Sequence, residues 1–309
     1  MSSEAVFPAK SAREWSVGIL LSIGGAGLFS LKGVVAKLAY AEGMTVSQAL
    51  TWRMSLALPV YLIIGIVAFA RTGPRLKRQT YALAAGLGVL SYYVSSTLDF
   101  WGLQYVTAQL ERLTLYVYPT LTAVLSWVFL KERATRAHIV ALGLAYLGVA
   151  ILFGSEVGHQ GPAALAGALA VMGAAVTFAI YVTASRNVIR TMGAPLFTCV
   201  AMSAAAAMFL IQSAVEHAAS APPPLTPRAW MLMGFLAIFC TVVPSFMTSE
   251  GIRRIGPGPM SAVGSVGPVF AAWAAVAVLG EPFGWPHVFA FALTMAGVGL
   301  LSRPVKHAA

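Results

Sequence analysis

Long apolar runs alternate with short polar segments along almost the whole chain of 309 residues. A helix needs about 20 mainly apolar residues to cross the hydrocarbon core of a bilayer. Counted this way, the pattern predicts ten membrane-spanning helices, at 15–38, 46–70, 80–100, 104–130, 137–154, 162–185, 195–215, 229–249, 258–279 and 286–302. The boundary between the third and fourth spans is the weakest, because only the segment Asp99-Phe100-Trp101-Gly102 separates them.

Composition agrees with this pattern and leaves no room for a sizeable soluble domain. The chain is 59% hydrophobic and only 10% charged, whereas soluble domains carry about 25% charged residues. The net charge of +10 does not indicate a nucleic-acid-binding face, because the basic residues lie in short loops between apolar runs. We therefore predict an all-α integral membrane protein that contacts the lipid bilayer and does not bind nucleic acid.

Lys and Arg residues are distributed unevenly between the two sides that these spans define. With the N-terminus in the cytoplasm, the outer loops hold one of the 20, Arg228, and four lie within spans. The remaining 15 are Lys10, Arg13, Arg71, Arg75, Lys77, Arg78, Lys131, Arg133, Arg136, Arg186, Arg190, Arg253, Arg254, Arg303 and Lys306. Because cytoplasmic loops carry an excess of Lys and Arg, we predict a multi-pass protein of a bacterial-type inner membrane. Its cytoplasmic tails would be 1–14 and 303–309.

The chain matches itself at a constant shift of 149 residues without gaps. From 117 to 152, 11 of 36 positions are identical to their partners. The scarce residue types that recur include Phe29 with Phe178, Ser96 with Ser245, Pro119 with Pro268, Glu132 with Glu281 and His138 with His287. This predicts two repeats, 15–155 and 162–302. Each holds five helices, an odd number, so the second repeat is inverted relative to the first. Inverted repeats place a substrate site near the midplane and give alternating access by rocking.

The ends of the fourth and ninth spans carry a resemblance to a known family. Pro119 is followed by Leu130-Lys131-Glu132, and Pro268 by Leu279-Gly280-Glu281. Each motif leads into a glycine-containing helix, with Gly143 and Gly148 in one and Gly297 and Gly299 in the other. Over essentially its whole length the chain resembles the drug/metabolite transporter superfamily with its EamA-type repeats. The first half departs from the commoner Gly-Glu pair, since Lys131 replaces the glycine. Within the superfamily the chain looks most like exporters of aromatic amino acids, which implies export from the cytoplasm.

Ionisable residues inside the predicted spans are expensive to keep in a membrane and are candidates for function. Lys32, Asp99, Glu111 and Arg112 belong to the first half, and the shift of 149 replaces them by Tyr181, Thr248, Met260 and Ser261. A structural ion pair is an equal alternative for Lys32, Glu111 and Arg112. We expect Lys37 and Arg53 to extend to the outer membrane surface and to pair with Asp99 or Glu42. Glu132 and Glu281 are expected to cap or support the starts of the fifth and tenth spans.

Polar and aromatic residues share helix faces in several spans. Tyr92, Ser96 and Asp99 follow an i, i+4, i+7 spacing, and Arg112 and Tyr116 lie four residues apart. Packing between helices would also produce such stripes, but the mixture of hydroxyl, carboxylate and aromatic groups on one face favours a pocket. The predicted substrate-binding residues are Lys32, Tyr92, Ser96, Asp99, Glu111, Arg112, Tyr116, Phe178, Tyr181, Ser245 and Ser265.

A pocket with aromatic rings, hydroxyls and both signs of charge suits a small amphiphilic zwitterion. We therefore predict an exporter of small amphiphilic metabolites, with aromatic and other neutral amino acids as substrates and no cofactor or metal. Cationic drug-like compounds, another metabolite, or a channel are the alternatives. An enzyme is disfavoured, because neither H-E-x-x-H nor G-x-S-x-G occurs and the five histidines lie outside the span interiors. Proton coupling and the oligomeric state stay open.

Overall fold

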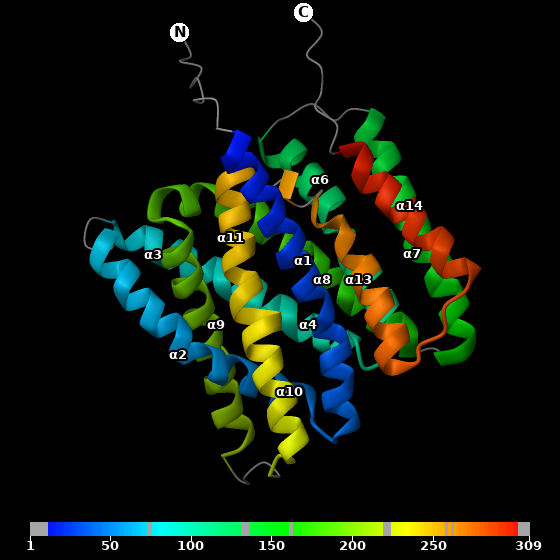
Figure 1. Ribbon diagram of the computed structural model, residues 1–309, viewed down its shortest axis with the longest axis horizontal. Helices are drawn as coiled ribbons and strands as arrows, with labels where there is room; N and C mark the ends of the chain where they lie inside the picture. The colour runs from blue at the N-terminus through cyan, green and yellow to red at the C-terminus, as the bar shows by residue number, and fades with distance from the viewer. Residues whose placement is uncertain are drawn as a thin grey trace, which may run out of the picture.

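The computed structural model describes residues 12–72, 76–130, 136–160, 163–218, 224–256, 259–260 and 263–301. Within these ranges the regular elements are all helical, and they pack side by side into one bundle (Figure 1). Helical segments cover each of the ten predicted ranges. The uninterrupted helices are α1 (Ala12–Ala41), α2 (Val46–Thr72), α7 (Arg136–Gln160), α8 (Ala163–Met192), α9 (Ala194–Glu216) and α14 (Trp285–Leu301).

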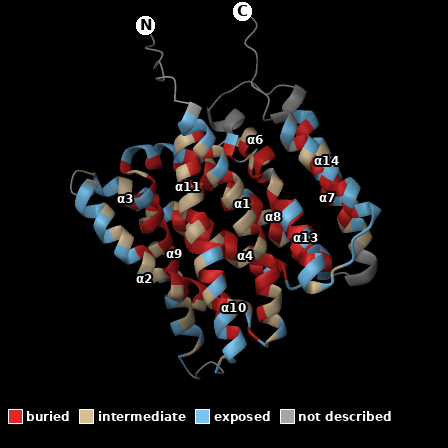
Figure 2. Ribbon diagram, viewed as in Figure 1, coloured by how far each residue is buried: buried red, intermediate tan, exposed pale blue. Residues whose placement is uncertain are grey.

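Length and hydropathy identify part of this bundle as membrane-spanning. In the described part of the chain, five stretches are long and apolar enough to cross a bilayer: Arg13–Ala41, Val46–Arg71, Ala163–Met192, Ala194–Glu216 and Pro227–Ile255. Two shorter apolar stretches are Ile139–Ser155 and Gly267–Leu279. Buried residues line the interior of the bundle and exposed ones its periphery (Figure 2), where large apolar side chains such as Ile66 and Trp273 lie open. The all-helical membrane class is thus confirmed, and the number of ten crossings stays a prediction.

The third and eighth predicted spans contain a wider helical turn at equivalent places. In the third span, α3 (Arg78–Gly88) continues into a π-helical segment, η2 (Val89–Ser95), and then α4 (Ser96–Gly102). In the eighth span, α10 (Pro227–Ala237) continues into the π-helical segment η3 (Ile238–Val242) and then α11 (Val243–Ile255). The two π-helical segments begin at 89 and 238, which differ by the same 149 residues. Such segments are often found at functional sites.

The fourth and ninth predicted spans are broken near their prolines. The fourth consists of α5 (Ala108–Leu115), a turn at 116–117, and α6 (Tyr118–Leu130). The ninth contains a 3₁₀ segment, η4 (Gly264–Val266), then α13 (Gly267–Ala274) and a π-helical segment, η5 (Ala275–Leu279). Pro119 and Pro268 are each the second residue of the restarted helix. Amides in the first turn of a helix donate no intrahelical hydrogen bond, so a proline there removes none. The bends predicted at these prolines are therefore located just before them.

Close helix contacts recur between the two halves at the sequence shift. A Cβ added at Gly18 would lie 2.5 Å from the Ile255 side chain, and one at Gly167 would lie 3.2 Å from Val106. The two pairs are related by the shift of 149, since Gly18 corresponds to Gly167 and Val106 to Ile255. Likewise, a Cβ on Gly148 would lie 2.6 Å from the carbonyl of Ala290, and one on Gly297 would lie 2.6 Å from the carbonyl of Ala141. Exchanging the halves reproduces these contacts, as expected for a twofold relation.

The start of α1 and the end of α14 lie at the same end of the bundle (Figure 1). The α1–α2 connection and the start of α10 lie at the opposite end (Figure 1). Which end faces the cytoplasm, and the repeat limits 15–155 and 162–302, stay predictions. The motif residues Lys131 and Glu132 lie outside the described residues.

Candidate functional site

A central cavity lies between helices of the two halves. Its volume is about 80 Å³, which is smaller than the roughly 300–1,000 Å³ typical of sites that hold drug-sized ligands. The π-helical segments contribute Ser91, Tyr92, Ser95 and Thr241 to its wall. Its lining consists of Ser22, Ala26, Phe29, Lys32, Arg53, Ser91, Tyr92, Ser95, Ser96, Asp99, Arg112, Leu115, Tyr116, Tyr118, Phe178, Thr241, Thr248, Met260 and Gly264.

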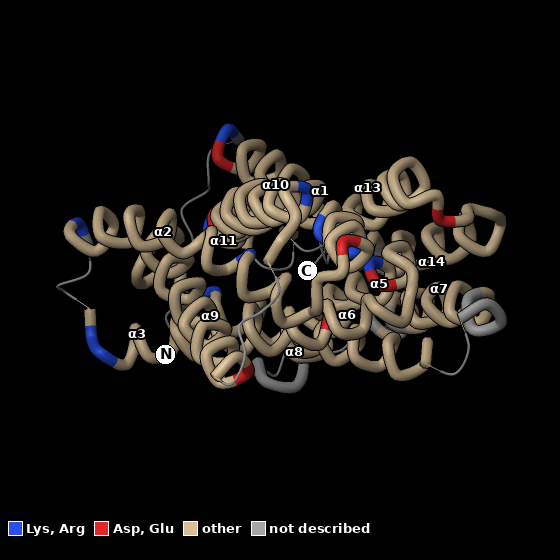
Figure 3. The backbone as a smooth tube through the Cα atoms, turned by 90° about the horizontal axis from the view of Figure 1, so that it is seen from below, with Lys and Arg blue, Asp and Glu red and all other residues tan. Residues whose placement is uncertain are grey.

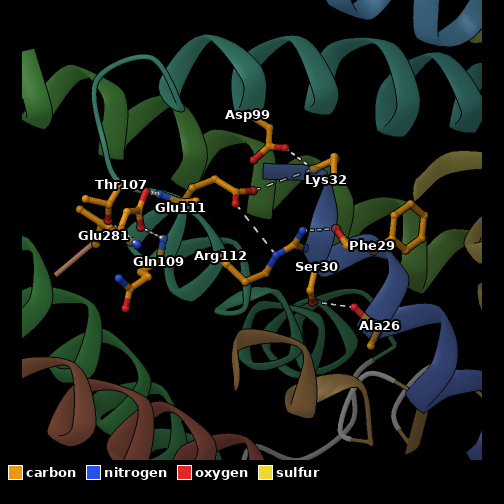
Figure 4. A network of polar contacts seen from close by, with 12 residues as sticks. Ala26, Phe29, Ser30, Lys32, Asp99, Thr107, Gln109, Glu111, Arg112 and Glu281 are labelled. Carbon is orange, nitrogen blue, oxygen red and sulfur yellow. Dashed lines mark hydrogen bonds and ion pairs between the residues drawn. The ribbon is translucent and has the colours of Figure 1, made fainter. Parts of the chain in front are cut away.

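Two cations and two carboxylates form a buried network along one side of this cavity. The ammonium group of Lys32 on α1 donates to Asp99 Oδ2 on α4 and lies 3.9 Å from Glu111 Oε1. Arg112 Nε lies 4.0 Å from Glu111 Oε2, and its Nη2 donates to the Phe29 carbonyl (Figure 4). Seen from below, acidic and basic residues gather beside α5 inside the bundle (Figure 3). Buried charges persist where partners surround them, so these groups hold one another in place.

The N-terminus of α5 fixes the position of Glu111. The hydroxyl of Thr107 caps this helix by accepting from Leu110 N at 3.0 Å. Glu111 therefore lies in the first helical turn, where a negative charge is favourable. Its Oε2 reaches so close to α1 that a Cβ added at Gly33 would lie 2.9 Å away. The absent side chain of Gly33 thus makes room for this carboxylate.

Glu281 takes a different role from the predicted one. Its carboxylate accepts from Ala108 N at 2.8 Å and from Gln109 N at 3.3 Å, so it caps the start of α5 and not the start of the tenth span (Figure 4). The reason lies in Gly280, whose left-handed backbone (φ 66°) turns the chain after η5 toward α5. Lys37 Nζ lies 3.7 Å from Glu281 Oε1. This Glu281 cap joins the segment before α14 to α1 and α5.

Aromatic rings also form part of the cavity wall. The hydroxyls of Tyr92 and Tyr181 lie 3.2 Å apart, and their rings meet edge-on at 5.4 Å. Phe178 stacks on Tyr181 at 5.8 Å and receives the edge of Tyr118 at 4.9 Å. Tyr116 meets Tyr118 edge-on at 5.6 Å. These five side chains are the aromatic wall; Tyr181 supports it from behind, because the cavity lining includes only the other four.

The structure brings most of the predicted substrate-binding residues together. Those that line the cavity are Lys32, Tyr92, Ser96, Asp99, Arg112, Tyr116 and Phe178. Glu111 and Tyr181 lie directly behind the lining. The hydroxyl of Ser245 bonds instead to the Val242 carbonyl (2.7 Å) and the Tyr61 hydroxyl (2.9 Å). The side chain of Ser265 lies outside the described part of the chain.

Arg53 and Lys37 do not pair as expected. Arg53 is only 2% exposed and lines the cavity, with its guanidinium carbon 5.0 Å from the centre of the Phe100 ring. It does not reach the outer surface, because its side chain points into the bundle and lies against Phe100. Lys37 pairs with Glu281, while Glu42 pairs with Arg228 at 3.2 Å.

Sequence reasoning also missed several hydroxyl and aromatic groups of the lining. Phe29, Tyr118, Thr241 and Thr248 all line the cavity. The two threonines lie seven residues apart on the eighth predicted span, a spacing that keeps both on one helix face. That spacing was the available signal.

Known proteins resemble this chain over most of its length. The EamA-like transporter family matches residues 16–154 and 165–303. The uncharacterized transporter YcbK of Bacillus subtilis (strain 168) is 25% identical over 88% of each chain. YyaM of the same organism, also an uncharacterized transporter, is 27% identical over 84% of this chain and 85% of its own.

Two further matches extend the comparison to a relative with a named substrate and to a solved fold. The S-adenosylmethionine/S-adenosylhomocysteine transporter of Chlamydia trachomatis serovar L2 (strain ATCC VR-902B / DSM 19102 / 434/Bu) is 25% identical over 78% of this chain and 76% of its own. A crystal structure matches with a TM-score of 0.65 and 20% identity, over 92% of this chain and 96% of that one. At this identity the match shows a shared fold.

Proposed function

The chain belongs to the EamA-like transporter family of membrane proteins, and on that premise we propose that it exports small amphiphilic metabolites, chiefly aromatic and other neutral amino acids. The observation that carries this proposal is the combination of the aromatic wall with the buried charges of Lys32, Asp99 and Arg112 in one cavity. Rings stack on rings, while charged groups bind the polar end of a zwitterion.

Alternating access at this cavity is part of the proposal. Four of the spans that surround it are broken or contain π-helical turns, and these breaks occur at equivalent places in the two halves. Inverted repeats with interrupted helices commonly surround a midplane site and rock about it. The Chlamydia trachomatis relative is named for S-adenosylmethionine and S-adenosylhomocysteine, compounds that also join an amino acid group to an aromatic base.

Export of cationic drug-like compounds is the second candidate. A lone carboxylate in the cavity would favour it. Lys32 donates to Asp99, and both Lys32 and Arg112 lie within 4.0 Å of Glu111, so neither carboxylate stands alone in the cavity. This argues for a substrate with a polar group of its own that carries negative charge.

Efflux from reconstituted vesicles tests the proposal. The Tyr92→Ala, Tyr116→Ala and Tyr181→Ala variants each remove an aromatic contact, and such contacts contribute about 0.5–1.5 kcal/mol beyond area burial. We expect phenylalanine efflux to fall by about 2- to 13-fold in each. Tyr146→Ala, at a partly exposed tyrosine of α7, is the matched control and should leave efflux unchanged.

The assay should compare phenylalanine, tryptophan, leucine and an organic cation, with and without a pH gradient. Saturable counterflow separates a carrier from a channel. If all three tyrosine variants are inserted normally and export phenylalanine like the unmodified protein, the aromatic-pocket proposal is wrong.

A further inference from the structure

One charged group of the cavity is left without a partner. Arg53 lines the cavity, and its Nε and Nη2 atoms are buried without any hydrogen-bond partner among the described residues. In that part of the chain no carboxylate lies within 4.0 Å of it. Its close contact with the Phe100 ring supplies a cation–π attraction, but a ring face accepts no planar pair of hydrogen bonds. A guanidinium is shaped to bind a carboxylate with two parallel hydrogen bonds.

The other cations of the cavity are already engaged. Lys32 donates to Asp99 and lies near Glu111, and Arg112 donates to the Phe29 carbonyl and also approaches Glu111. Formally, three cations face two carboxylates, so one positive charge is in excess. Burying an unpaired charge is costly unless something compensates it. The cavity can therefore accommodate one more negatively charged group, and Arg53 is the cation that lacks such a partner.

The cavity also has an unpartnered carboxylate oxygen that can accept a hydrogen bond from a positively charged group. Asp99 also lines the cavity, and its Oδ1 atom is buried without a hydrogen-bond partner among the described residues, whereas Oδ2 accepts from Lys32. Phe100, the next residue in sequence, contacts Arg53, so α4 brings Asp99 and the Arg53 environment to the same part of the cavity.

We propose that Arg53 binds the carboxylate of the transported amino acid, while the free oxygen of Asp99 accepts from its ammonium group and the aromatic wall receives its side chain. This inference rests on the proposed function, and it assigns the carboxylate to Arg53 and not to Lys32 or Arg112. The position equivalent to Arg53 in the second half is Met202, which is fully buried. Each transporter therefore has a single carboxylate site, on one side of its twofold relation.

Ligands that lack one charged group at a time test this assignment. Phenylalanine, its methyl ester, phenylpropionate and phenethylamine are each titrated against the purified full-length protein. A hydrogen bond to a charged group corresponds to roughly 10- to 100-fold in affinity. We expect phenylalanine to bind about 10- to 100-fold more tightly than its methyl ester, and more tightly than phenylpropionate, which lacks the ammonium group.

Arg53→Met, which introduces the residue found at position 202, should abolish the preference for the free acid over the ester. It should leave the affinity for the ester and for phenethylamine within about twofold. Arg53→Lys keeps the charge and loses the planar pair of donors, so it should retain a smaller preference for the acid. It also tests the assignment if Arg53→Met fails to fold. Arg78→Met, at an exposed arginine where α3 begins, is the control and should behave like the unmodified protein.

The outcomes separate this inference from the proposed function. If phenylalanine binds and the Arg53→Met protein still prefers the acid to the ester, the Arg53 assignment is overturned while the proposed function stands. An Arg53→Lys protein that shows no preference for the acid would likewise overturn it. If the unmodified protein binds phenylpropionate but no amino acid, and Arg53→Met loses that binding, the proposed function fails and the carboxylate site stands. If the unmodified protein neither binds phenylalanine more tightly than its methyl ester nor binds phenylpropionate, the proposed function and the Arg53 assignment both fail.

Discussion

Lys32 and Asp99 form an ion pair that joins α1 to α4 in the interior of the bundle. Removing one partner of a buried pair leaves an uncompensated charge, and this costs about 3–5 kcal/mol. Removing both partners leaves no such charge. The pair therefore contributes to stability by linking α1 to α4, independently of any role in binding substrate.

A double-mutant cycle tests this dependence. We expect Lys32→Met and Asp99→Asn each to lower the free energy of unfolding by up to about 3–5 kcal/mol. Each loss is read from the fall in the thermal unfolding midpoint of the purified protein. The double variant should lose much less than the sum of the two. Additive losses would show that the two side chains do not depend on each other.

Gly267 sets the position of one ring of the aromatic wall. A Cβ added there would lie 2.5 Å from the Tyr116 hydroxyl oxygen and 2.7 Å from the ring carbon that bears it. Gly267 is the first residue of α13, and Tyr116 lies in the turn between α5 and α6. The two broken spans therefore meet through a tyrosine that lies flat against a glycine.

Gly267→Ala should push Tyr116 out of its place and reduce phenylalanine efflux several-fold, with a stability cost of about 1–3 kcal/mol for overpacking. Gly143→Ala on α7 is the matched control, since nothing lies within 4 Å of a Cβ at that position. Efflux measured in vesicles at equal protein content checks both variants. Equal activity of Gly267→Ala and Gly143→Ala would contradict this role for Gly267.

At the scale of elements, the Glu281 cap connects segments that are far apart in the sequence. One carboxylate serves two amides of α5 and an ammonium group of α1, and the Gln109 side chain donates to the Pro282 carbonyl at 3.0 Å. In the predicted orientation this connection lies on the outer side of the cavity. It would have to break when the cavity opens outward.

Glu281→Gln should weaken this connection, because an amide offers the α5 amides no full negative charge. Hydrogen bonds to charged groups contribute about 1.5–3 kcal/mol each, so the outward-open population should rise roughly tenfold or more. A cysteine introduced at Ser95, with Cys199 and Cys240 replaced by Ala, reports this through its labelling rate by an impermeant thiol reagent added outside. An unchanged labelling rate would show that the cap does not hold the outer side closed.

Hydropathy located the helices well but could not foresee how they are interrupted or what they contact. The π-helical segments η2 and η3 lie inside apolar runs, and average hydropathy does not respond to a change in hydrogen-bond register. The contact from Glu281 to Ala108 spans 173 residues and depends on the left-handed backbone at Gly280. Neither the direction of that turn nor its target is encoded in local spacing.

The candidate site could be predicted in part for a physical reason. Lys32, Asp99 and Arg112 stood out because charge is rare in apolar spans and must face the interior. Arg53 was misplaced because its position near the start of α2 allows either surface or interior, and only the packing of α2 in the bundle, which turns Arg53 toward Phe100, decides between them. Ring contacts such as Tyr92 with Tyr181 join different helices, so periodicity within one helix cannot reveal them.

At the scale of the whole molecule, the twofold relation and the charge distribution make a prediction about topology. Both described ends of the chain lie at one end of the bundle, and the inner-side excess of Lys and Arg predicts that this end is cytoplasmic. Fluorescent protein fused to either terminus should fluoresce, since it folds in the cytoplasm. Inserted in the segment after Ala218, before α10, it should stay dark, whereas alkaline phosphatase should be active there. The reverse pattern would invert the predicted orientation.

The excess positive charge at Arg53 also exposes the transporter to the membrane voltage. Moving one elementary charge through a potential of 100 mV changes its energy by about 2.3 kcal/mol. The interior of a bacterial cell is electrically negative, so the empty cavity is favoured when it is continuous with the cytoplasm. A zwitterion adds no net charge and leaves this bias in place. The voltage would therefore favour the return of the empty carrier to the cytoplasmic side and oppose the outward step of the loaded carrier by the same factor. Net export of a zwitterion would have to be driven by its own concentration gradient.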